Sequence, residues 1–156
     1  MATESYKVAN EFLRLAAERG VALTPLQLMK LVYIAHGWML GLYQRPLIKN
    51  RIEAWKYGPV IPDLYSLTKK FGSGAVTGEL RPWFSSQASE LDLQEKHLVG
   101  EVYGVYGDLS GLQLSALTHR TGTPWQITYR PESWAVPISN DLIAEHYHQL
   151  GRERTR

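Results

Sequence analysis

The stretch from Thr24 to Tyr43 is apolar on almost every side and constrains the fold more than any other part of the chain. Thr24, Pro25 and Gln27 together are typical of a helix start, because the hydroxyl accepts a free N–H, the proline suits the first turn and the glutamine reaches back. A helix with apolar side chains around nearly its whole circumference must be enclosed by other elements. These side chains are Leu26, Leu28, Met29, Leu31, Val32, Tyr33, Ile34, Ala35, Trp38, Met39, Leu40 and Leu42.

One narrow stripe of this predicted helix lacks bulk or carries charge. At 100° per residue, Gln27, Lys30, Ile34, Gly37 and Gly41 fall in one sector about 80° wide. Glycine leaves room beside a helix axis that no other residue leaves. Either water or the backbone of a close neighbour is therefore expected along this stripe.

Length and composition indicate one mainly α-helical domain. A chain of 156 residues is long enough for a single hydrophobic core. We predict a single-domain helical bundle around the central buried helix, with a small β hairpin; the domain spans residues 1–151 and a charged C-terminal tail spans 152–156. The net charge of only +2, with dispersed basic residues, makes nucleic acid an improbable partner.

The expected location is the cytoplasm, and no membrane partner is expected. Cysteine is absent, which suits a reducing compartment, and the opening residues lack the basic start and apolar block of a signal peptide. Lys30 and His36 make the central helix too polar for a membrane span.

Capping pairs and apolar periodicity predict further helices on both sides of the central one. Leu47–Ile48 and the segment 52–55 favour two short extended pieces around residues 49–51, which would form the hairpin. The segment 72–91 has no sustained period and is expected to be a long loop. The predicted helices end at Arg19, run from Pro62 to about Lys70, from Asp92 to Gly107, from Ser110 to about His119 and from Ser139 to Leu150, with one short turn at 123–126.

Metal and catalytic motifs are missing from the sequence. His36 lies on a thickly apolar side of its helix, where a hydrogen-bonded core histidine is expected, and His146 and His148 point to different faces. The chain contains no H-E-x-x-H, no G-x-S-x-G and no G-x-x-x-x-G-K-[ST] pattern. We therefore expect no metal, no cofactor and no enzymatic activity.

Aromatic residues gather around a rigid turn that contains Gly58, Pro59 and Pro62. Two interpretations fit Trp55, Tyr57 and Tyr65 in this segment: core packing, or the aromatic anchors that dominate protein interfaces. Trp38 lies at the edge of the glycine stripe, where it would line a groove.

Three segments resemble the Panacea domain, also called the SocA-like antitoxin domain, which occurs in proteins labelled phage-associated. They are L-Q-L-M-K-L-V-Y-I-A-H-G-W at 26–38, I-E-A-W-K-Y-G-P-V-I-P-D-L-Y at 52–65, and L-T-H-R with T-P-W at 117–120 and 123–125. The middle motif, E-A-W-x-Y-G-P-x-x-P, is the most specific of them. The resemblance covers most of the chain.

The resemblance implies a mostly helical antitoxin of a toxin–antitoxin module. Such a protein neutralises a cognate protein toxin, encoded by an adjacent gene, by direct binding. An alternative within the family is a proteolytic adaptor that delivers the toxin to a ClpXP-type protease, which would then be a second partner. Alternatives from other classes are a nucleic-acid-binding regulator and an uncharacterised enzyme.

The family motifs supply the candidate partner-binding residues. We hypothesise that the turn from Trp55 to Tyr65 forms one composite region with the segment 118–125. The competing interpretation is that the motif residues hold the fold, and that the toxin contacts less distinctive positions nearby. The candidates are Trp38, Trp55, Tyr57, Gly58, Pro59, Pro62, Tyr65, Thr118, His119, Pro124 and Trp125.

Overall fold

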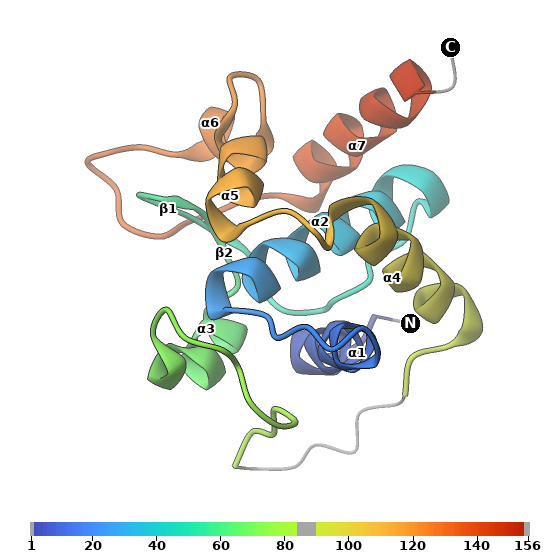
Figure 1. Ribbon diagram of the computed structural model, residues 1–156. Coiled ribbons are helices and arrows are strands. Elements are labelled where there is room, and N and C mark those ends of the chain that lie inside the picture. Colours follow the sequence, from blue (N-terminus) through green and yellow to red (C-terminus); the bar gives the residue numbers. More distant parts are fainter. Residues whose placement is uncertain (1, 84–89, 155–156) are drawn as a thin grey trace.

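The central helix of the fold is α2 (Pro25–Tyr43), as the apolar stretch predicts. The structure is a computed structural model that describes residues 2–83 and 90–154. The Thr24 side chain accepts the Gln27 N–H, and the Gln27 side chain accepts the Thr24 N–H, which completes the predicted cap. Most of α2 is buried, and the other helices lie around it (Figure 1). The mainly α fold is confirmed.

Six further α-helices of the described residues surround α2. The predicted caps at the starts of α4, α5 and α6 are present, since Asp92, Ser110 and Thr123 each accept the N–H three residues on. Short-range hydrogen bonds of this kind satisfy N–H groups that have no partner inside a helix. The helices are α1 (Ser5–Glu18), α3 (Pro62–Thr68) with the 3₁₀ turn η1 (Lys69–Phe71), α4 (Leu93–Tyr106), α5 (Gly111–His119), α6 (Pro124–Thr128) and α7 (Asn140–Arg154).

Helix α7 covers the glycine stripe of α2. A Cβ atom on Gly41 would lie 2.7 Å from the backbone N of His148 and the backbone C of Tyr147, and one on Gly37 would overlap the Tyr147 ring. The stripe therefore contacts the backbone of a close neighbour, which was one of its two predicted surroundings. The absence of side chains at these positions lets the two helices approach closely.

The predicted end of the last helix was wrong. Helix α7 continues through Gly151 to Arg154, so residues 152–154 of the predicted charged tail belong to the helix. The Arg154 guanidinium lies over the rings of Trp38 and Tyr106, 5.2 and 5.8 Å from their centroids, and donates to the Tyr106 hydroxyl. These contacts anchor the last turn of the helix.

A three-stranded antiparallel sheet in the order β2-β1-β3 lies at one end of α2 (Figure 1). Strand β1 (Glu53–Trp55) pairs with β2 (Gly58–Val60) and with β3 (Val136–Pro137). A hairpin is thus present, but its predicted pairing was wrong.

The segment 47–48 is not a strand of this sheet because its backbone groups bond elsewhere. Ile48 forms a parallel bridge with Thr3, the Thr3 N–H donates to the Leu47 carbonyl, and the N–H groups of Leu47 and Ile48 both donate to His36. The pairing partner of β1 is instead the segment that follows the two-residue turn at Lys56 and Tyr57.

The predicted long loop joins η1 to α4. Its first half is tied to the core, since the Val76 N–H donates to the Leu23 carbonyl and the Leu80 N–H donates to the Asn10 side chain. Residues 84–89 of this loop lie outside the described residues. Within the described ranges, no helix combines the length and apolarity needed to cross a bilayer.

The cap of α2 supplies a first test of the fold. We expect Thr24→Ala to lower the free energy of unfolding by about 1 kcal/mol and Tm by roughly 3 °C, because an N–H at the start of a buried helix loses its acceptor. Thermal unfolding followed by circular dichroism measures this change. Thr121→Ala, at an exposed turn position, is the matched control, and an equal loss in both variants would contradict the capping role.

Candidate protein-binding site

The hairpin and the segment 118–125 meet in the folded chain. The Trp125 indole N–H donates to the carbonyl of Trp55, at 2.6 Å, across 70 residues of sequence. The His119 ring lies edge-on to Trp125, with 4.3 Å between centroids, and Tyr129 stacks on Trp125 at 4.9 Å. The two family motifs therefore form one contiguous region at the sheet.

The same region encloses a lysine of the central helix. The Lys30 ammonium donates to the carbonyl of Pro59 at 3.0 Å, and Lys30 as a whole is only 2% exposed. Gly58 has a φ of +127°, and a Cβ there would lie 2.7 Å from Lys30 Nζ and 3.0 Å from His119 Cε1. Glycine at this position thus leaves space for the ammonium. Burial disfavours the charged form and lowers the pKa of Lys30 to about 8.

Several motif residues are committed to the fold. Thr118 is buried and donates to the Ser115 carbonyl, and Pro62 and Pro124 occupy the first turns of α3 and α6. Trp38 lies outside the composite region: its indole N–H donates to the Tyr106 hydroxyl, and its ring packs edge-on against Tyr147. Trp38 does line a separate hollow of about 220 Å³ beside α4 and α7, as its position by the glycine stripe suggests.

The histidine of α2 is a satisfied core residue, as predicted. His36 Nδ1 accepts the N–H groups of Leu47 and Ile48, each at 3.2 Å, and its Nε2 lies 2.9 Å from the Asn140 side-chain oxygen. Among the residues the structure describes, no group of three His, Asp or Glu side chains is placed to hold a metal ion.

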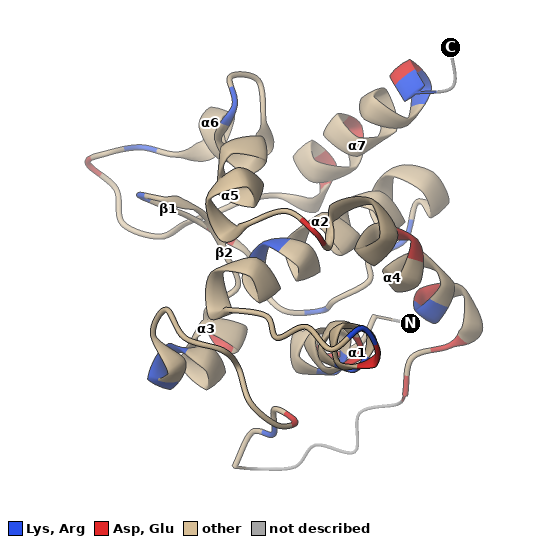
Figure 2. Ribbon diagram, in the orientation of Figure 1, with Lys and Arg blue, Asp and Glu red and all other residues tan. Residues whose placement is uncertain are grey.

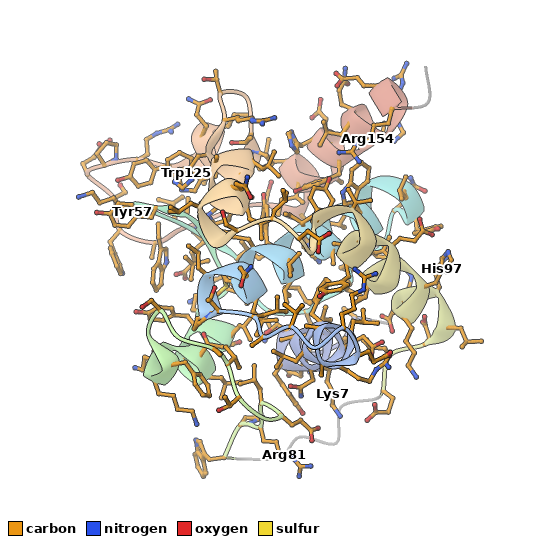
Figure 3. All side chains as sticks on the ribbon, viewed as in Figure 1. Lys7, Tyr57, Arg81, His97, Trp125 and Arg154 are labelled. Carbon is orange, nitrogen blue, oxygen red and sulfur yellow. The ribbon has the colours of Figure 1, made fainter. Side chains whose placement is uncertain are left out.

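A cleft of about 530 Å³ opens beside the hairpin, and we call it the aromatic cleft. Trp55 forms its wall, with Tyr65 edge-on at 5.3 Å and Trp134 at 5.2 Å between ring centroids. Figure 3 shows Tyr57 and Trp125 on the same side of the molecule. The cleft is lined by Pro25, Leu26, Met29, Lys30, Trp55, Lys56, Tyr57, Val60, Tyr65, Thr68, Lys69, Gly72 and Trp134.

Large aromatic rings at the rim of the aromatic cleft are open to solvent. Tyr57 is 74% exposed and Trp134 is 79% exposed, whereas Trp55 is half-buried. Exposed aromatic side chains on a hydrogen-bonded hairpin are the kind of group that anchors protein interfaces at little cost in conformational entropy. The cleft is thus suited to binding another chain.

Trp134 was missed by the sequence reasoning. It lies in an irregular segment after α6, and only the pairing of β3 with β1 brings it over Trp55. The next residue, Ala135, has a φ of +61°, a left-handed conformation that costs a non-glycine residue about 1 kcal/mol. Such local strain is often found at functional sites, and it was not readable from the sequence.

The charges that line the aromatic cleft are all positive. Lys30, Lys56 and Lys69 line it, and no Asp or Glu of the described ranges does. Elsewhere the basic residues are scattered over several elements and interspersed with acidic ones (Figure 2). The cleft therefore has a local positive character that the net charge of the chain does not reveal.

Fold and site together define a small helical domain with a cleft lined by exposed aromatic rings. Residues 28–126 match the family described as "Antitoxin SocA-like, Panacea domain". The chain belongs to this family, which confirms the resemblance read from the three motifs. It is similar to Antitoxin SocA of Caulobacter vibrioides (strain NA1000 / CB15N), with 33% identity over 126 residues that cover 77% of this chain and 67% of that protein. No solved structure matches the chain significantly.

Proposed function

We propose that this protein is the antitoxin of a toxin–antitoxin module and that it neutralises a cognate protein toxin by direct binding. The observation that carries the proposal is the aromatic cleft, whose exposed Tyr57 lies in the motif E-A-W-x-Y-G-P-x-x-P of an antitoxin family, with the exposed rings of Tyr65 and Trp134 beside it. The proposed partner is encoded by an adjacent gene, and both proteins act in the cytoplasm. No reaction is assigned to the protein.

The two interpretations of the motif residues apply to different side chains. We assign Tyr57 and Tyr65 to the partner-binding surface because they are exposed, and we add Trp134 for the same reason. We assign the candidates that are buried, hydrogen-bonded or placed at a helix start to the support of that surface. The supporting residues are Trp38, Trp55, Gly58, Pro59, Pro62, Thr118, His119, Pro124 and Trp125.

Co-expression with the adjacent gene tests the proposal. The neighbouring protein alone should arrest growth, and this chain should restore growth and form a complex that survives gel filtration. A harmless neighbour, or a toxic one that forms no complex with this chain, would refute neutralisation by direct binding. An adaptor would instead shorten the half-life of the toxin only when a ClpXP-type protease is present.

The aromatic rim supplies a sharper version of this test. We expect Tyr57→Ala to weaken toxin binding about thirtyfold, because interface anchors of this type contribute 2 kcal/mol or more. The melting temperature should be unchanged, since Tyr57 projects from a turn into solvent. Isothermal titration calorimetry measures the affinity. Tyr43→Ala is the matched control, because Tyr43 is also exposed but lies outside the cleft; equal affinities for the two variants would remove Tyr57 from the interface.

A further inference from the structure

The buried lysine of the aromatic cleft has hydrogen-bonding capacity that the fold does not use. An ammonium group has three N–H donors, and the Pro59 carbonyl is the one acceptor that Lys30 Nζ has among the described residues. Removing a cation from water is costly unless charged or polar partners compensate for the loss. A ligand that brings an anionic acceptor to Lys30 would supply that compensation.

The other charges of the cleft have the same sign. Lys56 and Lys69 line the cleft with Lys30, and the Lys56 ammonium lies 5.4 Å from the centroid of the Tyr57 ring. No acidic side chain of the described ranges lines the cleft to neutralise them. A positive floor and rim between aromatic walls are complementary to a ligand that combines carboxylates with an apolar or aromatic group.

We propose that the aromatic cleft binds an acidic segment of the partner protein, with a carboxylate on the lysines and a neighbouring aromatic side chain packed against the wall that Trp55, Tyr65 and Trp134 form. The proposal rests on the proposed function in taking the partner to be a protein. The cleft volume of about 530 Å³ lies within the usual range for ligand clefts, about 300–1,000 Å³. Burial of a carboxylate beside Lys30 forms charge-assisted hydrogen bonds, which are shorter and stronger than neutral ones.

A short acidic peptide fits these features better than a nucleic acid does. Nucleic acids are bound through basic stripes that follow several phosphates, whereas the basic residues outside the cleft are scattered (Figure 2). Three cations around one hollow match one or two carboxylates. The charge pattern therefore favours an acidic segment of protein.

The tryptophan indole N–H signals give a direct test by ¹⁵N nuclear magnetic resonance. The chain has five tryptophans, and Trp→Phe variants assign their signals. The probe is the blocked peptide acetyl-Gly-Asp-Phe-Asp-Gly-amide, titrated to millimolar concentration, with the peptide carrying Asn for both Asp as its neutral counterpart. We expect the acidic peptide to move the signals of Trp55 and Trp134 but not that of Trp38. The affinity for the neutral peptide should be lower by a factor of about ten or more.

Lysine variants locate the charge that the peptide recognises. The double variant Lys56→Gln with Lys69→Gln removes two exposed lysines and should lower the affinity for the acidic peptide about tenfold. Lys30→Met should lower this affinity by a similar factor. Lys70→Gln is the matched control, because Lys70 is an exposed neighbour of Lys69 that does not line the cleft. The Lys70→Gln variant should bind the acidic peptide with the affinity of the unmodified chain. If Lys30→Met fails to fold, the double variant of Lys56 and Lys69 still tests whether the lysines of the cleft bind the peptide.

Three outcomes would overturn the proposal: no movement of the Trp55 and Trp134 signals, equal affinity for the acidic and neutral peptides, or a stronger response to a six-nucleotide single-stranded oligouridine. The same experiments separate a failure of this proposal from a failure of the proposed antitoxin function. If the complex with the toxin forms while both peptides leave the cleft signals unchanged, the cleft chemistry is wrong and the antitoxin function stands. If the acidic peptide binds and no toxin is neutralised, the antitoxin function is wrong and the cleft chemistry stands.

Discussion

Acidification from pH 6.5 to pH 4 is expected to lower the free energy of unfolding by about 3 kcal/mol through His36 alone. Burial lowers the pKa of His36 from 6.5 to about 4, and the hydrogen bond to Asn140 opposes this only in part. His36 Nδ1 must be unprotonated, because it accepts the N–H groups of Leu47 and Ile48. The proton is therefore on Nε2, which donates to the Asn140 side chain at 2.9 Å.

The direction of this pH effect follows from the number of protons that His36 binds in the folded and unfolded states. Between pH 6.5 and pH 4 the His36 imidazole is protonated to the cation in the unfolded chain and is neutral in the folded chain, so falling pH favours unfolding. The stabilisation is complete above pH 6.5 and is lost as the pH falls through about 4. The difference between the two pKa values corresponds to about 3 kcal/mol.

Urea unfolding at pH values from 7.5 to 4 measures this effect. Other groups also titrate in acid, including Asp92, whose pKa is lowered by its hydrogen bond from the Glu95 N–H. Comparison with His36→Gln isolates the histidine, since the variant should lack this share of the pH dependence although it is less stable at pH 7.5. His97→Gln is the matched control, because His97 lies on the surface of α4. Identical slopes for the chain and for His36→Gln would refute the role of His36.

Gly41→Ala is expected to destabilise the fold by about 3 kcal/mol. The added methyl group would lie 2.7 Å from the backbone of Tyr147 and His148 in α7, and no flexible side chain can move aside there. Helices α2 and α7 would have to separate along a contact that also includes Gly37. Overpacking that forces a backbone shift costs about 1–3 kcal/mol, and this contact belongs at the upper end of that range.

A second glycine provides the control for helix propensity. Gly104 is an exposed residue of α4, and a Cβ there would meet no atom within 4 Å. Gly104→Ala should therefore stabilise the fold by about 0.5–1 kcal/mol, because alanine is the better helix former and restricts the unfolded chain. Opposite signs of the two changes in urea unfolding support the close α2–α7 contact. A stabilising Gly41→Ala would rule that contact out.

Part of the candidate site could be predicted and part could not. The motif residues Trp55 and Trp125 were singled out together, and the hydrogen bond between them confirms that their segments meet. Their division into supporting and exposed residues depends on how α5 and α6 pack on the hairpin. The contribution of Trp134 follows from the pairing of β3 with β1, for which its irregular segment contains no periodic signal.

The sequence by itself determined the helix starts and the buried central helix. The caps at Thr24, Asp92 and Ser110 join groups three residues apart, and such hydrogen bonds form with little help from the rest of the chain. The apolar circumference of α2 likewise required that it be enclosed, because apolar surface is removed from water whichever element covers it.

Only the tertiary structure decided which partners these elements take. It placed α7 against Gly41, paired β1 with β2 instead of the segment 47–48, extended α7 to Arg154 and brought three lysines around one cleft. Such contacts join residues that are far apart in the chain, and several pairings satisfy the same local pattern. The packing of the whole core selects among them, because a close-packed interior fills its space and satisfies its buried polar groups together.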